Sequence, residues 1–225
     1  MIKKLLLISV FLFLPLITWA HQPRLASGVE MQVIEDPEVS KAYYGALKGE
    51  PEYYQIDSDS DFKFYINILA PDLADSKKDF KVDVYDGDYS QLPFLFLDGE
   101  TFVWEKYYEK YAGDSYYKGP EQRLDLKAGT YTIKVYSASN EGKYVLAVGE
   151  KETFGLAQIW EMVTVLPIIK MEFFNKSPFM ILYSALGQWL VIGLLTILVL
   201  IFIFVAFIRL IEKNTLKKIK KHKKY

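Results

Sequence analysis

The chain has 225 residues, 51% of them hydrophobic, and a formal net charge of −1. Once its two apolar ends are set aside, roughly 130 residues remain, enough for one domain with one core. The absence of cysteine excludes thiol catalysis, cysteine zinc sites and a lipid anchor on a cysteine. The acidic middle of the chain argues against a nucleic-acid partner.

The first 20 residues have the three parts of a signal peptide. Two lysines precede an apolar run, and Thr18 and Ala20 place small residues at the −3 and −1 positions of a cut before His21. We therefore predict that residues 1–20 are a cleaved signal peptide. The alternative is an uncleaved N-terminal anchor.

The middle of the chain has the pattern of β-strands. Apolar and polar side chains alternate in several short runs separated by glycine-containing turns, which is typical of antiparallel strands with one buried face. The runs lie at residues 62–68, 80–85, 124–127, 131–136 and 144–148. We predict a mainly β protein whose ectodomain, residues 43–152, is an antiparallel, jelly-roll-like β-sandwich, preceded by an N-terminal extension at residues 21–42.

Two groups of strand motifs resemble the bacterial pre-peptidase C-terminal type of β-sandwich. The opening motifs read AYYGAL at residues 42–47, YYQI at 53–56 and DFKF at 61–64. The closing pair reads LKAGTYTIKV at residues 126–135 and GKYVLAV at 142–148. The resemblance covers residues 43–149 and implies an accessory, binding or spacing role without a catalytic constellation. Residues 88–119 depart from the family pattern, because they are longer and more aromatic.

Residues 153–178 change to a near-helical spacing of apolar side chains, interrupted by Pro167. We predict an amphipathic juxtamembrane segment that lies in the membrane interface. The alternatives are a helix packed on the sandwich or on a partner's transmembrane helix, and a re-entrant dip into the bilayer.

Residues 181–208 contain no charged side chain, and about 20 apolar residues suffice to cross a bilayer. Residues 209–225 are strongly basic, which marks the cytoplasmic side. We therefore predict a single-pass type I protein of the cell membrane, with one C-terminal transmembrane helix, an extracytoplasmic N-terminal domain and a cytoplasmic tail.

Four residues are candidates for metal binding. As the predicted mature N-terminus, His21 combines an amine with an imidazole that copper could use, although the chain's second histidine is His222 in the tail. The alternating carboxylates of Asp57, Asp59 and Asp61 could offer oxygen ligands to calcium. The alternative is a solvated acidic turn between two strands.

Aromatic side chains are the candidates for partner contacts. They are dense in residues 94–117, which include Trp104, Tyr107 and Tyr108, and Trp160 lies in the juxtamembrane segment. Exposed aromatic rings form protein interfaces or stack on sugars, and filling of the sandwich core and edges is the alternative.

Our leading hypothesis is a non-enzymatic, membrane-tethered β-sandwich that binds or positions another envelope protein and has no cofactor. A Ser-His-Asp triad is excluded because the ectodomain lacks a histidine beyond His21. The second hypothesis is a module at the cell surface that handles calcium or copper or binds glycans. The expected partners are the lipid bilayer and another membrane or envelope protein.

Overall fold

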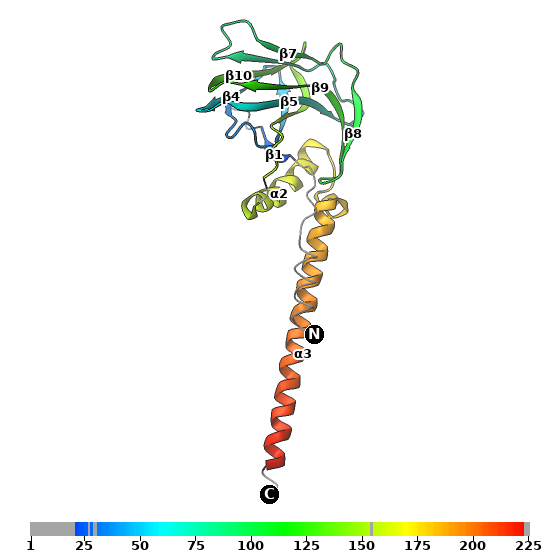
Figure 1. Cartoon of the computed structure of the whole chain (residues 1–225). Coiled ribbons are helices and arrows are strands. Elements are labelled where there is room, and N and C mark those ends of the chain that lie inside the picture. The colour runs from blue at the N-terminus through cyan, green and yellow to red at the C-terminus, as the bar shows by residue number, and fades with distance from the viewer. Residues whose placement is uncertain (1–20, 27, 29–30, 154, 223–225) are drawn as a thin grey trace. The chain divides into compact units, whose positions relative to one another are not determined.

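The computed structural model describes residues 21–26, 28, 31–153 and 155–222 (Figure 1). The predicted signal peptide lies outside the described residues. The chain separates into two units. One is the β domain together with the segment that ends at Ser184, and the other contains the helix that begins at Ala185.

The described residues form eleven strands, more than the eight to ten that the sequence pattern suggests. In chain order they are β1 (Gln22–Leu25), β2 (Gln32–Val33), β3 (Lys41–Lys48), β4 (Glu52–Ser58), β5 (Phe62–Pro71), β6 (Lys81–Asp86), β7 (Leu95–Asp98), β8 (Glu105–Glu109), β9 (Asp114–Leu126), β10 (Gly129–Tyr136) and β11 (Glu141–Val148).

The strands form two sheets in a sandwich-like arrangement, as predicted. One sheet has six strands in the order β1-β3-β11-β5-β9-β8, and the other has five in the order β2-β4-β10-β6-β7. Most neighbours are antiparallel, but β1 pairs with β3 and β2 pairs with β4 in parallel. Residues 21–42, expected as an extension ahead of the sandwich, therefore contribute an edge strand to each sheet.

The main core lies between the sheets and follows the alternation of the sequence. Every second residue of β5, β10 and β11 points inward, because side chains of a strand alternate between its faces. The fully buried members of this core include Ile66, Ile68, Val82, Val84, Ile133, Leu146 and Val148. The runs that alternate in the sequence are thus the central strands of the two sheets.

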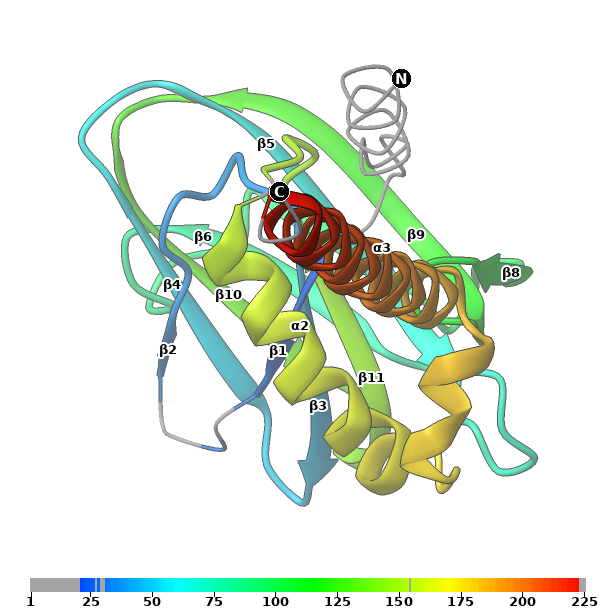
Figure 2. The ribbon, with the colours of Figure 1, turned by 90° about the horizontal axis from the view of Figure 1, so that it is seen from below.

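A third layer covers the outer face of the six-stranded sheet. The helix α2 (Leu156–Ile168) lies across β1, β3 and β11 (Figure 2). Its side chains Met162 and Leu166 are buried and share a small cavity with outward-facing residues of β3 and β11. The outward-facing residues at the centre of this sheet can be apolar because α2 covers them.

The rest of the juxtamembrane segment is irregular. Pro167 lies in the last turn of α2, and the chain then forms a π-helix, η1 (Ile169–Phe173), followed by a 3-10 helix, η2 (Pro178–Tyr183). A proline removes one backbone donor and crowds the preceding turn, so the helical pattern changes at this point. Of the predicted alternatives for this segment, the structure shows packing of one helical face on the sandwich.

The C-terminal helix α3 runs from Ala185 to His222. Its first 29 residues, Ala185–Lys213, are long and apolar enough to cross a membrane, and they contain an 18-residue window with a mean hydropathy of 3.3. This agrees with the predicted C-terminal transmembrane helix.

Candidate protein-docking site

The aromatic segment predicted to bind a partner forms one side of the sandwich. β7 is the last strand of the five-stranded sheet, and β8 is the last strand of the six-stranded sheet. The two strands follow each other in the chain, and β7 contacts β9 next to β8. A single stretch, residues 92–109, thus supplies an edge strand to both sheets, and we call it the β7–β8 side.

Large apolar side chains are exposed along the β7–β8 side. Val103, between the two strands, is 81% exposed, and Leu92, just ahead of β7, is 90% exposed. The other exposed members are Phe94, Phe96, Phe102, Tyr107 and Tyr108. Aromatic side chains are enriched in protein interfaces, and free strand edges offer unpaired backbone groups. The arrangement is therefore suited to docking a protein surface or an added strand.

Trp104 lies beneath this side and packs against the core. Its Nε1 donates a hydrogen bond to the carbonyl oxygen of Gly99 at 2.7 Å. A Cβ atom at Gly99 or Gly119 would come within 2.7 Å of the indole ring, so both glycines make room for it. Trp104 supports the side from within, whereas its neighbours present their rings outward.

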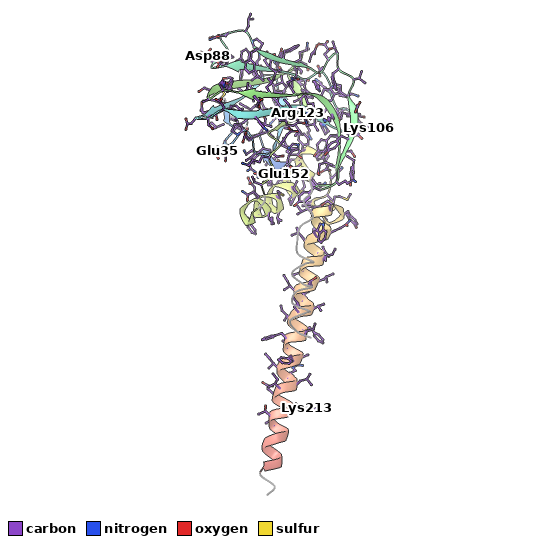
Figure 3. All side chains as sticks on the ribbon, in the orientation of Figure 1. Glu35, Asp88, Lys106, Arg123, Glu152 and Lys213 are labelled. Atoms are coloured by element: carbon purple, nitrogen blue, oxygen red, sulfur yellow. The ribbon has the colours of Figure 1, made fainter. Side chains whose placement is uncertain are left out.

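Tyr107 and Tyr108 point to opposite faces of β8, as a pair in a strand must. The ring of Tyr107 packs against Tyr116 with centroids 6.4 Å apart, and burial raises the pKa of its hydroxyl. The Tyr108 side chain is 56% exposed. Lys106, the residue before Tyr107, pairs with Asp72 at 3.1 Å and lies at the rim of the domain (Figure 3).

The turn after β8 is fixed by the carboxylates of Glu109 and Asp114. Glu109 accepts hydrogen bonds from the backbone N–H groups of Tyr111 and Ala112 at 2.7 and 2.6 Å, and burial raises the pKa of its carboxyl group. Asp114, at the start of β9, pairs with Lys170 of η1 at 2.6 Å and with Lys176 at 3.0 Å. The turn is therefore tied to the juxtamembrane segment by ion pairs.

Two further contacts hold η1 on the outer face of the six-stranded sheet. Lys143 of β11 donates hydrogen bonds to the carbonyl oxygens of Glu172 and Phe173 at 2.8 and 2.7 Å. The ring of Phe173 packs edge-to-face on Tyr44, with centroids 5.0 Å apart. These carbonyls belong to the C-terminal end of a helix, where cations are favourable partners.

Trp160 is separate from the other three predicted contact residues. It lies on α2, in the layer over the outer face of the six-stranded sheet, and its side chain is 71% exposed. The structure therefore brings Tyr107 and Tyr108 together at one edge, with Trp104 behind them, and places Trp160 on another surface. The exposed group of Leu92, Phe94, Phe96, Phe102 and Val103 was not singled out individually from sequence, because alternation does not tell an edge strand from a central one.

His21, the copper candidate, lies where β1 begins. Its Nδ1 is 2.6 Å from the Oγ of Ser40, and burial lowers the pKa of its imidazole to about 4. The ring lines a cavity of about 40 Å³ together with Met162 and Leu166 of α2. Its surroundings in the described chain are thus mainly apolar.

The three aspartates of the calcium candidate lie in and beside the turn between β4 and β5. Asp57 accepts hydrogen bonds from Gln55 and Thr130, each at 2.7 Å, and Asp61 pairs with Lys127 at 2.7 Å. No group of three or more histidine, aspartate or glutamate side chains among the described residues is placed to hold a metal ion. The calcium and copper hypotheses remain predictions.

The comparisons with known proteins found similar chains among solved structures. No protein-family model and no curated protein matches the chain. The pre-peptidase C-terminal domain of a collagenase from Bacillus anthracis matches 58% of this chain and 97% of its own length, with 11% identity and a TM-score of 0.32. CorA, a surface-associated copper-binding protein from Methylomicrobium album BG8, matches 57% of this chain and 100% of its own, with 6% identity and a TM-score of 0.29.

The resemblance to pre-peptidase C-terminal domains indicated by the strand motifs thus recurs among solved structures. At these identities and TM-scores the two similarities say nothing about a ligand. Fold and site together define the class of this chain: a β-sandwich protein whose described residues include one helix long and apolar enough to cross a membrane.

Proposed function

We propose that this protein is a non-enzymatic, membrane-tethered β-sandwich that docks and positions another envelope protein outside the cytoplasmic membrane. The observation that carries the proposal is the β7–β8 side, where the last strands of both sheets expose aromatic and aliphatic side chains. Exposed apolar groups of this kind are unfavourable in water and mark interaction surfaces. The proposal includes no resident metal or cofactor.

α3 and its flanks support the membrane location in this proposal. The stretch Ala185–Lys213 supplies a span, and the lysine-rich sequence after it favours the cytoplasmic side. The sandwich then lies on the other side of the membrane. A cleaved signal peptide at residues 1–20 agrees with this orientation, which gives a single-pass type I topology in the cell membrane.

A site-specific cross-linking experiment tests the docking proposal. The chain has no cysteine, so a single Val103→Cys variant can carry a photoactivatable cross-linker at the β7–β8 side. The matched control is Ala138→Cys, which is exposed in the turn between β10 and β11. In native membranes we expect one adduct of defined mass from position 103 and none from position 138.

A second variant tests whether the adduct depends on the exposed side chains of the β7–β8 side. Phe96→Ser, combined with Val103→Cys, removes an exposed ring of β7 and should strongly reduce the adduct while thermal unfolding stays nearly unchanged. Equal labelling from positions 103 and 138, or an adduct that persists in the Phe96→Ser variant, would contradict docking at this side.

A further inference from the structure

A second exposed apolar surface lies on the juxtamembrane segment. Its members are Ile159 and Trp160 of α2, Met171 of η1, and Phe179, Met180, Leu182 and Tyr183 of η2. Trp160, Phe179 and Tyr183 are 71%, 73% and 75% exposed. α2 also contacts η2, so these side chains belong to one layer on the outer side of the six-stranded sheet. We call them the juxtamembrane face.

Most charged side chains of this segment are held away from the juxtamembrane face. Glu161 pairs with Arg24 of β1 at 2.5 Å. Lys170 and Lys176 both pair with Asp114, and Lys170 is 1% exposed. Glu172 keeps an exposed side chain beside Met171. Most of the segment's charge is therefore neutralised against the sandwich, which leaves a mainly apolar and aromatic exterior.

Chain connectivity limits how far this face is from the bilayer. η2 ends at Tyr183, and α3 begins at Ala185. With a rise of about 2 Å per residue in a 3-10 helix, Phe179 lies within about 15 Å of the start of α3 in any arrangement of the two units. Counting about 20 residues, or about 30 Å, back from Arg209 places Trp189 at the outer edge of the hydrocarbon core. η2 then falls at the headgroup layer.

We propose that the juxtamembrane face rests in the interfacial region of the outer leaflet, with Trp160, Phe179 and Tyr183 as its anchors. Tryptophan and tyrosine are favoured at this depth, because an apolar ring and a polar group can each find a suitable environment there. Since Lys170 and Lys176 are tied to Asp114, the attraction is apolar rather than electrostatic. This surface is distinct from the β7–β8 side and does not depend on a protein partner.

Single nitroxide labels on the full-length protein in lipid nanodiscs test the proposal. The labels are placed by Trp160→Cys and Phe179→Cys, with Leu92→Cys as the exposed control and Leu190→Cys on α3 as the membrane control. Collision with oxygen, which concentrates in lipid, is compared with collision with a water-soluble nickel complex. We expect the oxygen-to-nickel ratio at positions 160 and 179 to be severalfold higher than at position 92 and closer to that at 190.

Varying the salt concentration and the lipid charge provides a second test. Because the anchors are apolar, the ratios at 160 and 179 should stay the same when salt is raised or when anionic lipid replaces zwitterionic lipid. The labelled proteins should unfold at the temperature of the unlabelled chain, because both replaced side chains are mostly exposed. Ratios equal to that at position 92 would overturn the proposal. Protection from both oxygen and nickel would also overturn it, since a protein surface would then cover the face.

Discussion

Lys170 of η1 and Asp114 of β9 form an ion pair in which both side chains are 1% exposed, with 2.6 Å between Nζ and Oδ2. The ammonium group also donates to the carbonyl oxygen of Ala112 at 2.7 Å. A buried charge requires such partners, because removal from water is otherwise very unfavourable. The pair thereby fixes the juxtamembrane segment to the turn between β8 and β9.

Removing one member of this pair should destabilise the domain strongly. Lys170→Met leaves the buried carboxylate of Asp114 with Lys176 alone, and Asp114→Asn leaves the ammonium of Lys170 without its counter-charge. We expect each variant to lose about 3–5 kcal/mol of unfolding free energy. Denaturant unfolding of the detergent-solubilised protein measures the loss.

The double variant Lys170→Met/Asp114→Asn is the control for the pair itself. It should be more stable than the sum of the single losses predicts, by about 0.5–3 kcal/mol, because neither buried charge is left alone. Strict additivity would show that the two residues act independently.

Gly45 of β3 leaves the space that the ring of Tyr144 fills. A Cβ atom at Gly45 of β3 would lie 2.5 Å from Cζ of Tyr144, whose hydroxyl donates to Glu52 at 2.7 Å. Gly45→Ala should therefore destabilise the domain by about 1–3 kcal/mol. Combining it with Tyr144→Leu, which removes the clashing atoms, should make the alanine almost neutral relative to Tyr144→Leu alone. A loss of the same size in both backgrounds would contradict this packing.

His21 should make the stability depend on pH. Burial lowers the pKa of its imidazole to about 4, from 6.5 when unfolded, although nearby Glu150 acts in the opposite direction. Between these values the unfolded chain binds the proton more readily, so stability rises with pH by up to about 1.4 kcal/mol per unit. Thermal unfolding from pH 4 to pH 7 should show this slope, and His21→Gln should reduce it. An unchanged slope in the variant would assign the dependence to other groups.

The aspartate turn should not bind calcium with a saturable signal. The carboxylates of Asp57 and Asp61 already accept hydrogen bonds from Thr130 and Lys127, each at 2.7 Å. Calcium requires six to eight oxygen ligands, which these side chains do not provide together. Calorimetric titration of the full-length protein should give only heat of dilution. Saturable heat that disappears in an Asp57→Asn/Asp61→Asn variant would contradict this expectation and support the calcium hypothesis.

The alternation of apolar residues was sufficient to predict the central strands. In β5, Phe64, Ile66 and Ile68 point into the core because side chains of a strand alternate strictly between its faces. The same rule did not predict β1 and β2. These strands are short, and each pairs in parallel with a strand to which no hairpin turn connects it. Such pairing depends on contacts between residues far apart in the chain.

The role of the aromatic segment in binding stays a prediction, whereas the exposure of its side chains is visible in the structure. The aromatic content of residues 94–117 indicated an interaction segment, and the exposure of Tyr107 and Tyr108 agrees with it. Trp104 belongs to the same aromatic segment, but its ring packs beneath the β7–β8 side because Gly99 and Gly119 leave space for it. Which ring faces outward depends on the neighbouring strand, which sequence alone does not specify.

The sequence by itself determined the apolar C-terminal helix, its basic flank and the β character of the domain, because each depends on the local order of apolar and charged residues. The tertiary structure alone decided that Lys170 is buried against Asp114, 56 residues away, and that α2 covers one sheet. It also decided that a single segment forms one edge of each sheet. These features arise from contacts between distant parts of the chain, whose free energy depends on packing and burial rather than on local pattern.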